Sequence, residues 1–205
     1  MEEVKPTLRQ RQAQVTRNLI LDAARALFLV QGYGATSIEQ IATEAGTGVS
    51  TIYAVFGNKR ELLAQVRWRA VQAADIPDLE SMTPAGSAAP ERLALLAARF
   101  RKLYESAGDV FVVQRAANDS DREVAANWAQ ASRDRRAHME RLLKPLAREL
   151  RVGLTLSRAT DVVEAVLGFE VYEVLVNRHA WSPAEYEGWL AWTLGQQLLA
   201  EVGRP

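Results

Sequence analysis

The chain of 205 residues contains no cysteine and only two histidines. Without cysteine it forms no disulfide bond and presents no thiolate to a metal or a substrate. Two histidines provide no HExxH or paired-histidine motif for a zinc site, and no GxSxG sequence marks a nucleophilic serine. The sequence therefore contains no evident motif for nucleophilic or metal-dependent catalysis. We expect that the protein is not an enzyme and binds no metal and no cofactor.

Long apolar runs are also missing. No segment approaches the ~20 apolar residues that cross a bilayer. The N-terminal MEEVKPTLRQRQ lacks the apolar core of a secretory signal peptide. Hydrophobic residues make up 48% and charged residues 24% of the chain, the balance of an ordinary globular protein. We expect a cytoplasmic protein with no membrane partner.

The formal net charge is zero, but the charges are unevenly distributed. Up to Ala74, nine basic residues are set against six acidic ones, a net charge of +3, and the remainder carries −3. This asymmetry indicates a modestly basic module joined to an acidic one, although +3 is also compatible with an ordinary protein surface.

Apolar residues recur at helical spacing through the first 74 residues. The pattern predicts a helix over 16–31 with Thr16 as its N-cap, and a short second helix that Thr36 or Ser37 caps. A third short helix is expected over 49–56. Asn58 and Glu61 form a capping-box pattern, so a fourth helix should begin at Lys59.

The segment 76–91 is rich in proline, glycine and serine and predicts a loop between two modules. Helical patterns follow near 91–106, 110–118, 120–151, 157–178 and 183–202, without a competing strand pattern. Pro145 should kink or break its helix, and Ser157 and Ser182 are predicted N-caps. The sequence predicts an all-α protein with one domain over 1–74 and a second over 75–205.

The stretch AGTGVSTIYAVFGNKREL, residues 45–62, combines glycines, hydroxyls and a lysine, as phosphate-binding loops do. A dinucleotide loop needs a preceding strand and a third glycine, but here Gly46 follows a helix and Thr51 occupies the third position. No GK[ST] follows to make a P-loop. Two short helices around a three-residue turn match helix-turn-helix geometry, whose second helix fits the DNA major groove.

The residues from Thr16 to Leu63 resemble the N-terminal DNA-binding domain of TetR-family transcriptional regulators, in TSIEQIATEAG, the turn, STIYAVF and GNKREL. The resemblance implies an N-terminal three-helix DNA-binding domain and a C-terminal helical domain for effector binding and dimerisation. It implies a repressor that a small apolar or aromatic effector releases from a palindromic operator. The chain departs from the family at Thr47-Gly48, where Val-Ser is usual, and at Val55, where a bulky aromatic is common.

Candidate DNA contacts follow from the third helix and from the resemblance. Because the apolar positions of this helix face the core, Gly48, Ser50, Thr51 and Ala54 should face the groove, where hydroxyls meet base edges and the alanine methyl meets thymine. The alternative is that they are small solvated residues. The resemblance implies phosphate contacts by Tyr53 and Lys59, helped by Thr36 and Thr51. Tyr53 alternatively packs on the core. Arg9, Arg11 and Arg17 form either a flexible arm that reaches DNA or a solvated tail.

Aromatic and polar residues alternate in the C-terminal half, as a small-molecule pocket requires. The predicted effector-binding residues are Tyr104, Phe111, Gln114, Arg115, Asn118, Trp128, Phe169 and Tyr172. Ordinary core packing is the alternative for the aromatic members. His138 is one of only two histidines and is expected at the surface or hydrogen-bonded.

The last two large helices are apolar on more than one side, which requires two partners. The resemblance implies that they pair with their symmetry mates in a homodimer, with Val166, Trp192 and Leu194 among the apolar residues; an internal core is the alternative. A ligand-independent helix-turn-helix protein and a helical enzyme remain as alternative functions. Charge favours the regulator, because a DNA-packaging protein would spread basic residues over its whole surface.

Overall fold

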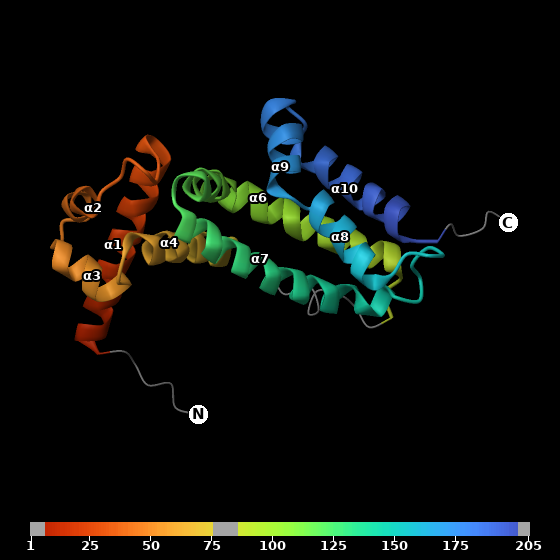
Figure 1. Cartoon of the computed structure of the whole chain (residues 1–205), viewed down its shortest axis with the longest axis horizontal. Helices are drawn as coiled ribbons and strands as arrows, with labels where there is room; N and C mark the ends of the chain where they lie inside the picture. The colour runs from red at the N-terminus through yellow and green to blue at the C-terminus, as the bar shows by residue number, and fades with distance from the viewer. Residues whose placement is uncertain (1–6, 76–85, 201–205) are drawn as a thin grey trace. The chain divides into compact units, whose positions relative to one another are not determined.

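The computed structural model describes residues 7–75 and 86–200, and most of these residues are helical (Figure 1). Within them no strand forms, and the one β-type contact is an isolated antiparallel bridge between Leu150 and Leu199. The all-α prediction is confirmed. The elements are α1 (Leu8–Gln31), α2 (Ile38–Glu44), α3 (Val49–Phe56), α4 (Lys59–Ala73), α6 (Ala89–Ser120), α7 (Arg122–Leu143), the 3-10 turn η1 (Lys144–Leu146), α8 (Leu156–Val166), α9 (Phe169–Tyr172), the π-helical η2 (Glu173–Arg178) and α10 (Pro183–Leu198).

The chain packs as two compact units. The first unit consists of residues 1–72 and 109–126, and the second of residues 73–108 and 127–205. The first unit thus includes a segment from the second half of the sequence, the end of α6 and the start of α7. The functional division at residue 75 stays a prediction.

The first helix begins earlier than predicted. Thr7 caps α1 through a capping box with Gln10, so the helix starts at Leu8 and Thr16 lies inside it. The Thr16 hydroxyl donates to the carbonyl of Gln12 at 3.1 Å. The first two turns contain arginine and glutamine, which are good helix formers but carry no apolar period, so the pattern gave no signal there. Gly32 ends the helix as predicted.

The next three helices begin close to where local signals place them. Ser37, one of two predicted caps, forms a capping box with Gln40. Asn58 Oδ1 accepts the backbone N–H of Glu61 at 2.9 Å, and α4 starts at Lys59 as predicted. The core of the first unit joins Ile20 and Phe28 of α1 to residues from all three helices, among them Ile41, Ile52 and Leu62, all at most 1% exposed.

A single continuous helix replaces the two that were predicted over 91–106 and 110–118. Helix α6 runs through Gly108 without interruption. A Cβ at this position would lie 3.1 Å from the ring of Phe169, so the glycine serves close packing rather than a helix end.

The remaining boundaries follow their caps. Helix α7 gives way to η1 at Pro145, as predicted. Thr155, not the predicted Ser157, caps α8. Gly168 separates α8 from α9 and η2, which divides the predicted helix over 157–178. Ser182 caps α10 through a capping box with Glu185. Of the loop predicted over 76–91, residues 76–85 lie outside the described residues, as does the predicted helix end at Val202. Residues 86–88 precede α6, which begins at Ala89, inside the predicted loop.

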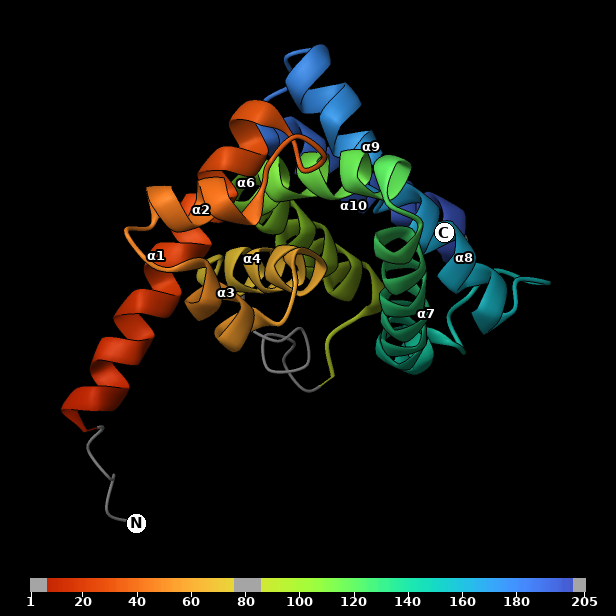
Figure 2. The same ribbon diagram turned by 60° about the vertical axis from the view of Figure 1, so that its left-hand side comes forward.

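The core of the second unit forms where α8 and α10 lie side by side (Figures 1 and 2). It buries Leu93 and Leu96 of α6, Val163 of α8, and Leu190 and Leu194 of α10, all at most 1% exposed. Leu194, predicted to lie in a dimer interface, is therefore an internal core residue of the protomer. No helix in the described parts of the chain has the length and apolar character to cross a membrane.

Candidate nucleic-acid interface

A turn of four residues, 45–48, joins α2 to α3. The backbone N–H of Ala45 bonds to the carbonyl of Ile41 at 2.9 Å, and that of Thr47 bonds to the carbonyl of Ala42 at 2.9 Å. Gly46 lies in the left-handed region at φ 63°, where glycine carries no Cβ penalty. These bonds fold the turn back onto α2 and fix the start of α3, so the glycine-rich stretch connects two helices and holds no phosphate loop.

Helix α3 divides its residues between core and surface. Ile52 and Phe56 are buried, whereas Ser50 and Ala54 are exposed and Thr51 is half-buried. Tyr53 is 49% exposed and Val55 is 39% exposed. Gly48 is the N-cap and offers no side-chain hydrogen bond. The structure thus brings the predicted groove-facing residues to one surface, and their contact with DNA stays a prediction.

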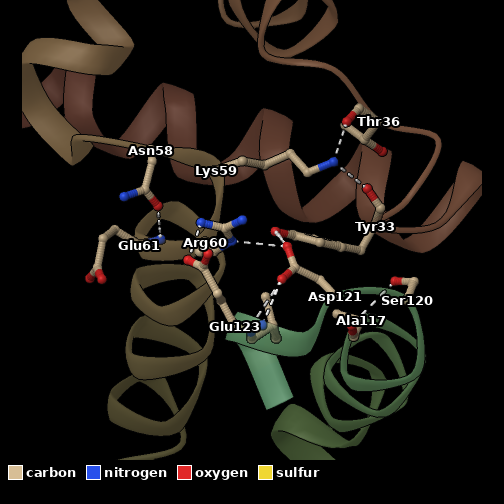
Figure 3. Close-up of polar contacts among 11 residues, drawn as sticks. Tyr33, Thr36, Asn58, Lys59, Arg60, Glu61, Ala117, Ser120, Asp121 and Glu123 are labelled. Carbon is tan, nitrogen blue, oxygen red and sulfur yellow. Dashed lines mark hydrogen bonds and ion pairs between the residues drawn. The ribbon is translucent and has the colours of Figure 1, made fainter. Parts of the chain in front are cut away.

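Two other predicted phosphate contacts, Thr36 and Lys59, meet at the turn before α2, which Lys59 reaches from the start of α4 (Figure 3). The Lys59 ammonium donates to the carbonyls of Tyr33 and Thr36 at 2.7 and 2.8 Å, and lies 4.2 Å from the centre of the Tyr33 ring. Burial lowers the pKa of Lys59. Thr36 is 2% exposed, and its hydroxyl donates to the carbonyl of Gly32. Both residues therefore stabilise the turn between α1 and α2.

Asp121 is the centre of a polar cluster that no local sequence pattern predicts (Figure 3). Its carboxylate accepts from Arg60 Nε at 3.0 Å and from the Tyr33 hydroxyl at 3.4 Å. The same carboxylate accepts the backbone N–H groups of Glu123 and Val124, at 3.0 and 3.2 Å, which caps α7. One side chain thus connects the α1–α2 turn, the first turn of α4 and the start of α7.

The charges of this cluster act on one another. Arg60 also pairs with Glu123. The hydrogen bond from Arg60 lowers the pKa of Asp121. Burial, reinforced by the Asp121 charge, raises the pKa of Tyr33 to about 12. At neutral pH the carboxylate is therefore ionised and the phenol keeps its proton. We call Tyr33, Arg60, Asp121 and Glu123 the Asp121 cluster. It holds the turn before α2 and the start of α4 together, and so stabilises the helix-turn-helix.

Two further polar contacts connect α1 and α4 to the end of α6. The Arg25 guanidinium pairs with Asp109 at 2.7 Å. Arg67 of α4 donates to Gln114 Oε1 at 2.6 Å, and Gln114 donates to Asn118 at 2.8 Å. Gln114 is buried, at 2% exposed. Gln114, a predicted effector residue, thus accepts a hydrogen bond from an arginine of the first unit.

The arginines predicted as a flexible arm lie within α1 instead. The Arg17 guanidinium donates to Gln65 Oε1 at 2.8 Å and lies 4.8 Å from the centre of the Phe56 ring. It therefore packs against α4 and the end of α3. Arg9 and Arg11 are exposed in the first turn of α1, so neither belongs to an extended tail.

The predicted effector residues are divided between the two units. Phe111, Gln114, Arg115 and Asn118 belong to the first, and Tyr104, Trp128, Phe169 and Tyr172 belong to the second. In the second unit, Tyr104 lies 5.3 Å from Phe169 and 5.5 Å from Tyr172, ring centre to ring centre. Tyr186 stands edge-on to Tyr172 at 5.0 Å. Trp128 lies 4.2 Å below the Arg135 guanidinium.

The aromatic cluster of the second unit consists of Tyr104, Phe169, Tyr172 and Tyr186, all at most 6% exposed. The Tyr104 hydroxyl donates to the carbonyl of Leu167, and burial raises the pKa of Tyr104. Sequence reasoning missed Tyr186, which lies one turn into α10. Over the residues that the structure describes, no three histidine or acidic side chains gather as a metal site would require.

A four-residue turn joins two short helices, and the second helix exposes small polar and apolar side chains. This arrangement is the helix-turn-helix of a large class of DNA-binding proteins. Residues 20–66 match the family model described as bacterial regulatory proteins, tetR family. The matched segment spans the end of α1, all of α2 and α3, and the first half of α4, so the helix-turn-helix itself carries this similarity.

Solved structures with a similar fold extend the likeness over almost the whole chain. NalD of Pseudomonas aeruginosa, the secondary repressor of the MexAB-OprM multidrug efflux pump, is 22% identical with a TM-score of 0.74, over 94% of this chain and all of NalD. A SmeT–triclosan complex is 22% identical with a TM-score of 0.73, covering 93% and 98%. FadR of Bacillus subtilis with stearoyl-CoA is 20% identical with a TM-score of 0.70, covering 86% and 96%. Among curated protein sequences, none matches.

Proposed function

We propose that this protein is a sequence-specific DNA-binding transcriptional regulator that acts in the cytoplasm as a homodimer. It represses transcription while it is bound to a palindromic operator. It dissociates from this operator when a small apolar or aromatic molecule binds to the protein. The observation that carries the proposal is the exposed face of α3 on a helix-turn-helix that matches the tetR family model. The proposal includes no catalytic reaction.

The first unit supplies two kinds of DNA contact. Ser50, Thr51 and Ala54, with the backbone of Gly48, face base edges from α3. Tyr53 and Lys59 flank them and contact phosphate. The Lys59 ammonium uses two of its three protons on backbone carbonyls, which leaves one for a phosphate oxygen beside the first amides of α4. Thr36 acts through the turn that it stabilises.

A homodimer is needed because α3 has only eight residues and reads few base pairs. Two such helices in one dimer would read half-sites about 34 Å apart, one turn of B-DNA. Helix α10 offers a surface for pairing. Trp192 is 63% exposed and borders a shallow groove with Gly195 and Leu199, which a second copy of α10 would cover.

The aromatic cluster of the second unit supports an apolar or aromatic effector, since aromatic side chains with few polar groups are typical of ligand sites. Two of the similar structures are complexes with compounds that carry a large apolar part: triclosan with SmeT, and stearoyl-CoA, through its acyl chain, with FadR of Bacillus subtilis. We propose a compound of this general class for the present chain.

Selection from a random duplex pool, followed by gel-shift titration, tests the DNA-binding proposal. We expect one discrete palindromic sequence, bound more tightly than its scrambled version. The logarithm of affinity should fall linearly with the logarithm of salt, with a slope near 0.9 per phosphate contacted. Equal affinity for selected and scrambled duplexes would contradict the proposal and favour a ligand-independent packaging role.

The effector proposal needs a separate test. Tryptophan fluorescence is titrated with apolar and aromatic compounds, and every compound that binds is added to the operator complex. Release of operator by at least one compound, with about 5–150-fold lower affinity, is expected. Binding without any change in operator affinity supports the ligand-independent alternative. Conversion of a bound compound into a product would support the enzyme alternative instead.

A further inference from the structure

Helix α3 has no charged side chain, and neither do the residues beside it. From Ala45 to Asn58 the sequence contains no aspartate, glutamate, lysine, arginine or histidine. Guanine is usually read by arginine or lysine, which donate to O6 and N7 in the major groove, and adenine by a bidentate asparagine or glutamine. No residue of α3 itself offers either chemistry.

The described polar neighbours that could supply this chemistry are engaged within the first unit. Arg17 donates to Gln65 and lies over Phe56, and Lys59 donates to two carbonyls. The amide oxygen of Gln40 accepts from the backbone of Ser37 at 2.7 Å. The amide oxygen of Asn58 accepts from the backbone of Glu61 at 2.9 Å.

The exposed surface of α3 presents methyl groups and hydroxyls instead. Ser50 and Ala54 are four residues apart, and so are Thr51 and Val55, so these four side chains form one continuous patch on the helix. The patch offers the Ala54 methyl, the Val55 isopropyl group and the Thr51 methyl, together with two hydroxyls. Val55 is 39% exposed, so much of its apolar surface has no protein neighbour.

Only one group in the major groove of DNA is apolar, the C5 methyl of thymine. From the composition of this patch we infer that the protein reads its half-site chiefly through thymine methyl groups, with Ala54 and Val55 as the residues that determine specificity. The inference rests on the proposed function and adds to it the class of base that the operator must present.

The contact removes apolar surface of both partners from water. A contact that buries one methyl group contributes about fourfold in affinity. The Ser50 and Thr51 hydroxyls donate to or accept from neighbouring base edges, which orients the helix but discriminates little, because hydroxyls pair with either kind of edge.

Replacement of thymine by uracil tests the inference, because uracil differs only by the missing methyl and pairs with adenine in the same way. Each thymine of the selected operator is replaced in turn, in both half-sites, and affinity is measured by fluorescence anisotropy. We expect at least one thymine position whose replacement lowers affinity about fourfold per half-site. Replacements outside the half-sites should leave affinity unchanged.

Protein variants assign the methyl contacts. In Ala54→Gly or Val55→Ala, the ratio between thymine and uracil operators should approach one at the position that the residue contacts. The comparison is made within each variant, so a general loss of stability cancels. Val112→Ala is the matched control, since Val112 is also 39% exposed on a helix of the same unit. It should keep the wild-type ratio.

The outcomes separate the two proposals. A discrete operator whose half-sites lack thymine, or whose affinity does not change with uracil, overturns the thymine inference and leaves the proposed function intact. A ratio that Ala54→Gly and Val55→Ala both leave unchanged also overturns it. Failure to select any sequence contradicts the proposed function itself, which is a different observation.

Discussion

Single residues decide how firmly the α1–α2 turn is held, and Lys59 is the first of these. Its ammonium makes two charge-assisted hydrogen bonds to backbone carbonyls in a half-buried position. Lys59→Met keeps the apolar stem and removes the donors, so we expect about 1–2 kcal/mol lower stability together with weaker DNA binding. Urea denaturation measures the first effect.

The control for this variant is Lys144→Met. Lys144 is exposed at the start of η1, and its replacement should change stability by less than about 0.5 kcal/mol. If Lys59→Met is as stable as the wild type, the carbonyl contacts contribute nothing net, and the residue acts on DNA alone.

Asp121 makes the stability of the first unit depend on pH. Its pKa is lowered by Arg60, so the ionised carboxylate stabilises the fold above the pKa of an unfolded aspartate, about 3.9. This contribution is lost as pH falls through the lower folded value. Asn is an equally good N-cap, so Asp121→Asn removes the charge while keeping the cap of α7.

Thermal unfolding of wild type and Asp121→Asn between pH 2 and pH 7 tests this expectation. The wild type should be the more stable protein above about pH 5, and the difference should begin to narrow below about pH 4 and close only below the lowered pKa of the folded carboxylate. Added salt should also reduce it, because the pair is partly exposed. A difference that stays constant with pH would show that the carboxylate charge is not the cause.

At the scale of elements, the sequence predicted the helix boundaries that capping residues and proline determine. Asn58, Ser182 and Pro145 act within one turn of their own positions, and the helix boundaries that they mark were predicted correctly. The start of α1 was missed because its cap precedes two polar turns. The continuity of α6 was missed because Gly108 is needed for close packing against Phe169, a residue far away in the sequence.

The candidate site divides in the same way. The exposed face of α3 follows from helical periodicity, so Ser50, Thr51 and Ala54 could be selected from the sequence alone. The Asp121 cluster could not, because Arg60 and Tyr33 lie 61 and 88 residues from Asp121 along the chain. Contacts at such separations depend on packing that no local pattern records.

The connection between η2 and α10 contains a strained position. Ala180 has φ 57°, in the left-handed region, where a residue with a Cβ costs about 1–2 kcal/mol. Ala180→Gly removes that cost but gives the unfolded chain more freedom, so we expect a net gain of about 0.5 kcal/mol. Chemical denaturation measures it.

The matched control is Ala165→Gly in α8, an exposed position inside a regular helix. This substitution should lower stability by about 0.5–1 kcal/mol. Opposite signs for the two variants would confirm the strain at Ala180, whereas destabilisation by both would mean that the observed turn is not strained in solution.

At the scale of the whole molecule, the proposed dimer distinguishes two neighbouring residues of α10. Trp192 is 63% exposed and Leu194 is fully buried. Trp192→Glu should leave a folded monomer that binds a full palindrome at least tenfold more weakly, because only a dimer fixes the half-site spacing. Leu194→Glu should unfold the second unit, because it buries an unpaired charge.

Light scattering gives the oligomeric state of each variant, and circular dichroism gives its fold. Single half-site affinity serves as the internal control, since it should survive in Trp192→Glu. A dimeric Trp192→Glu variant would place the interface on another surface, and a folded monomeric Leu194→Glu would show that this leucine is not part of the internal core.

The discontinuity of the first unit has a consequence for synthesis of the protein. The partners of Arg25, Arg60 and Arg67 lie in residues 109–126 of the same unit. A ribosome that adds about 5–20 residues per second makes the helix-turn-helix several seconds before it makes these partners. A nascent chain therefore carries its DNA-reading helix before that helix is fully supported, and the unit matures only after Ala126 has left the exit tunnel.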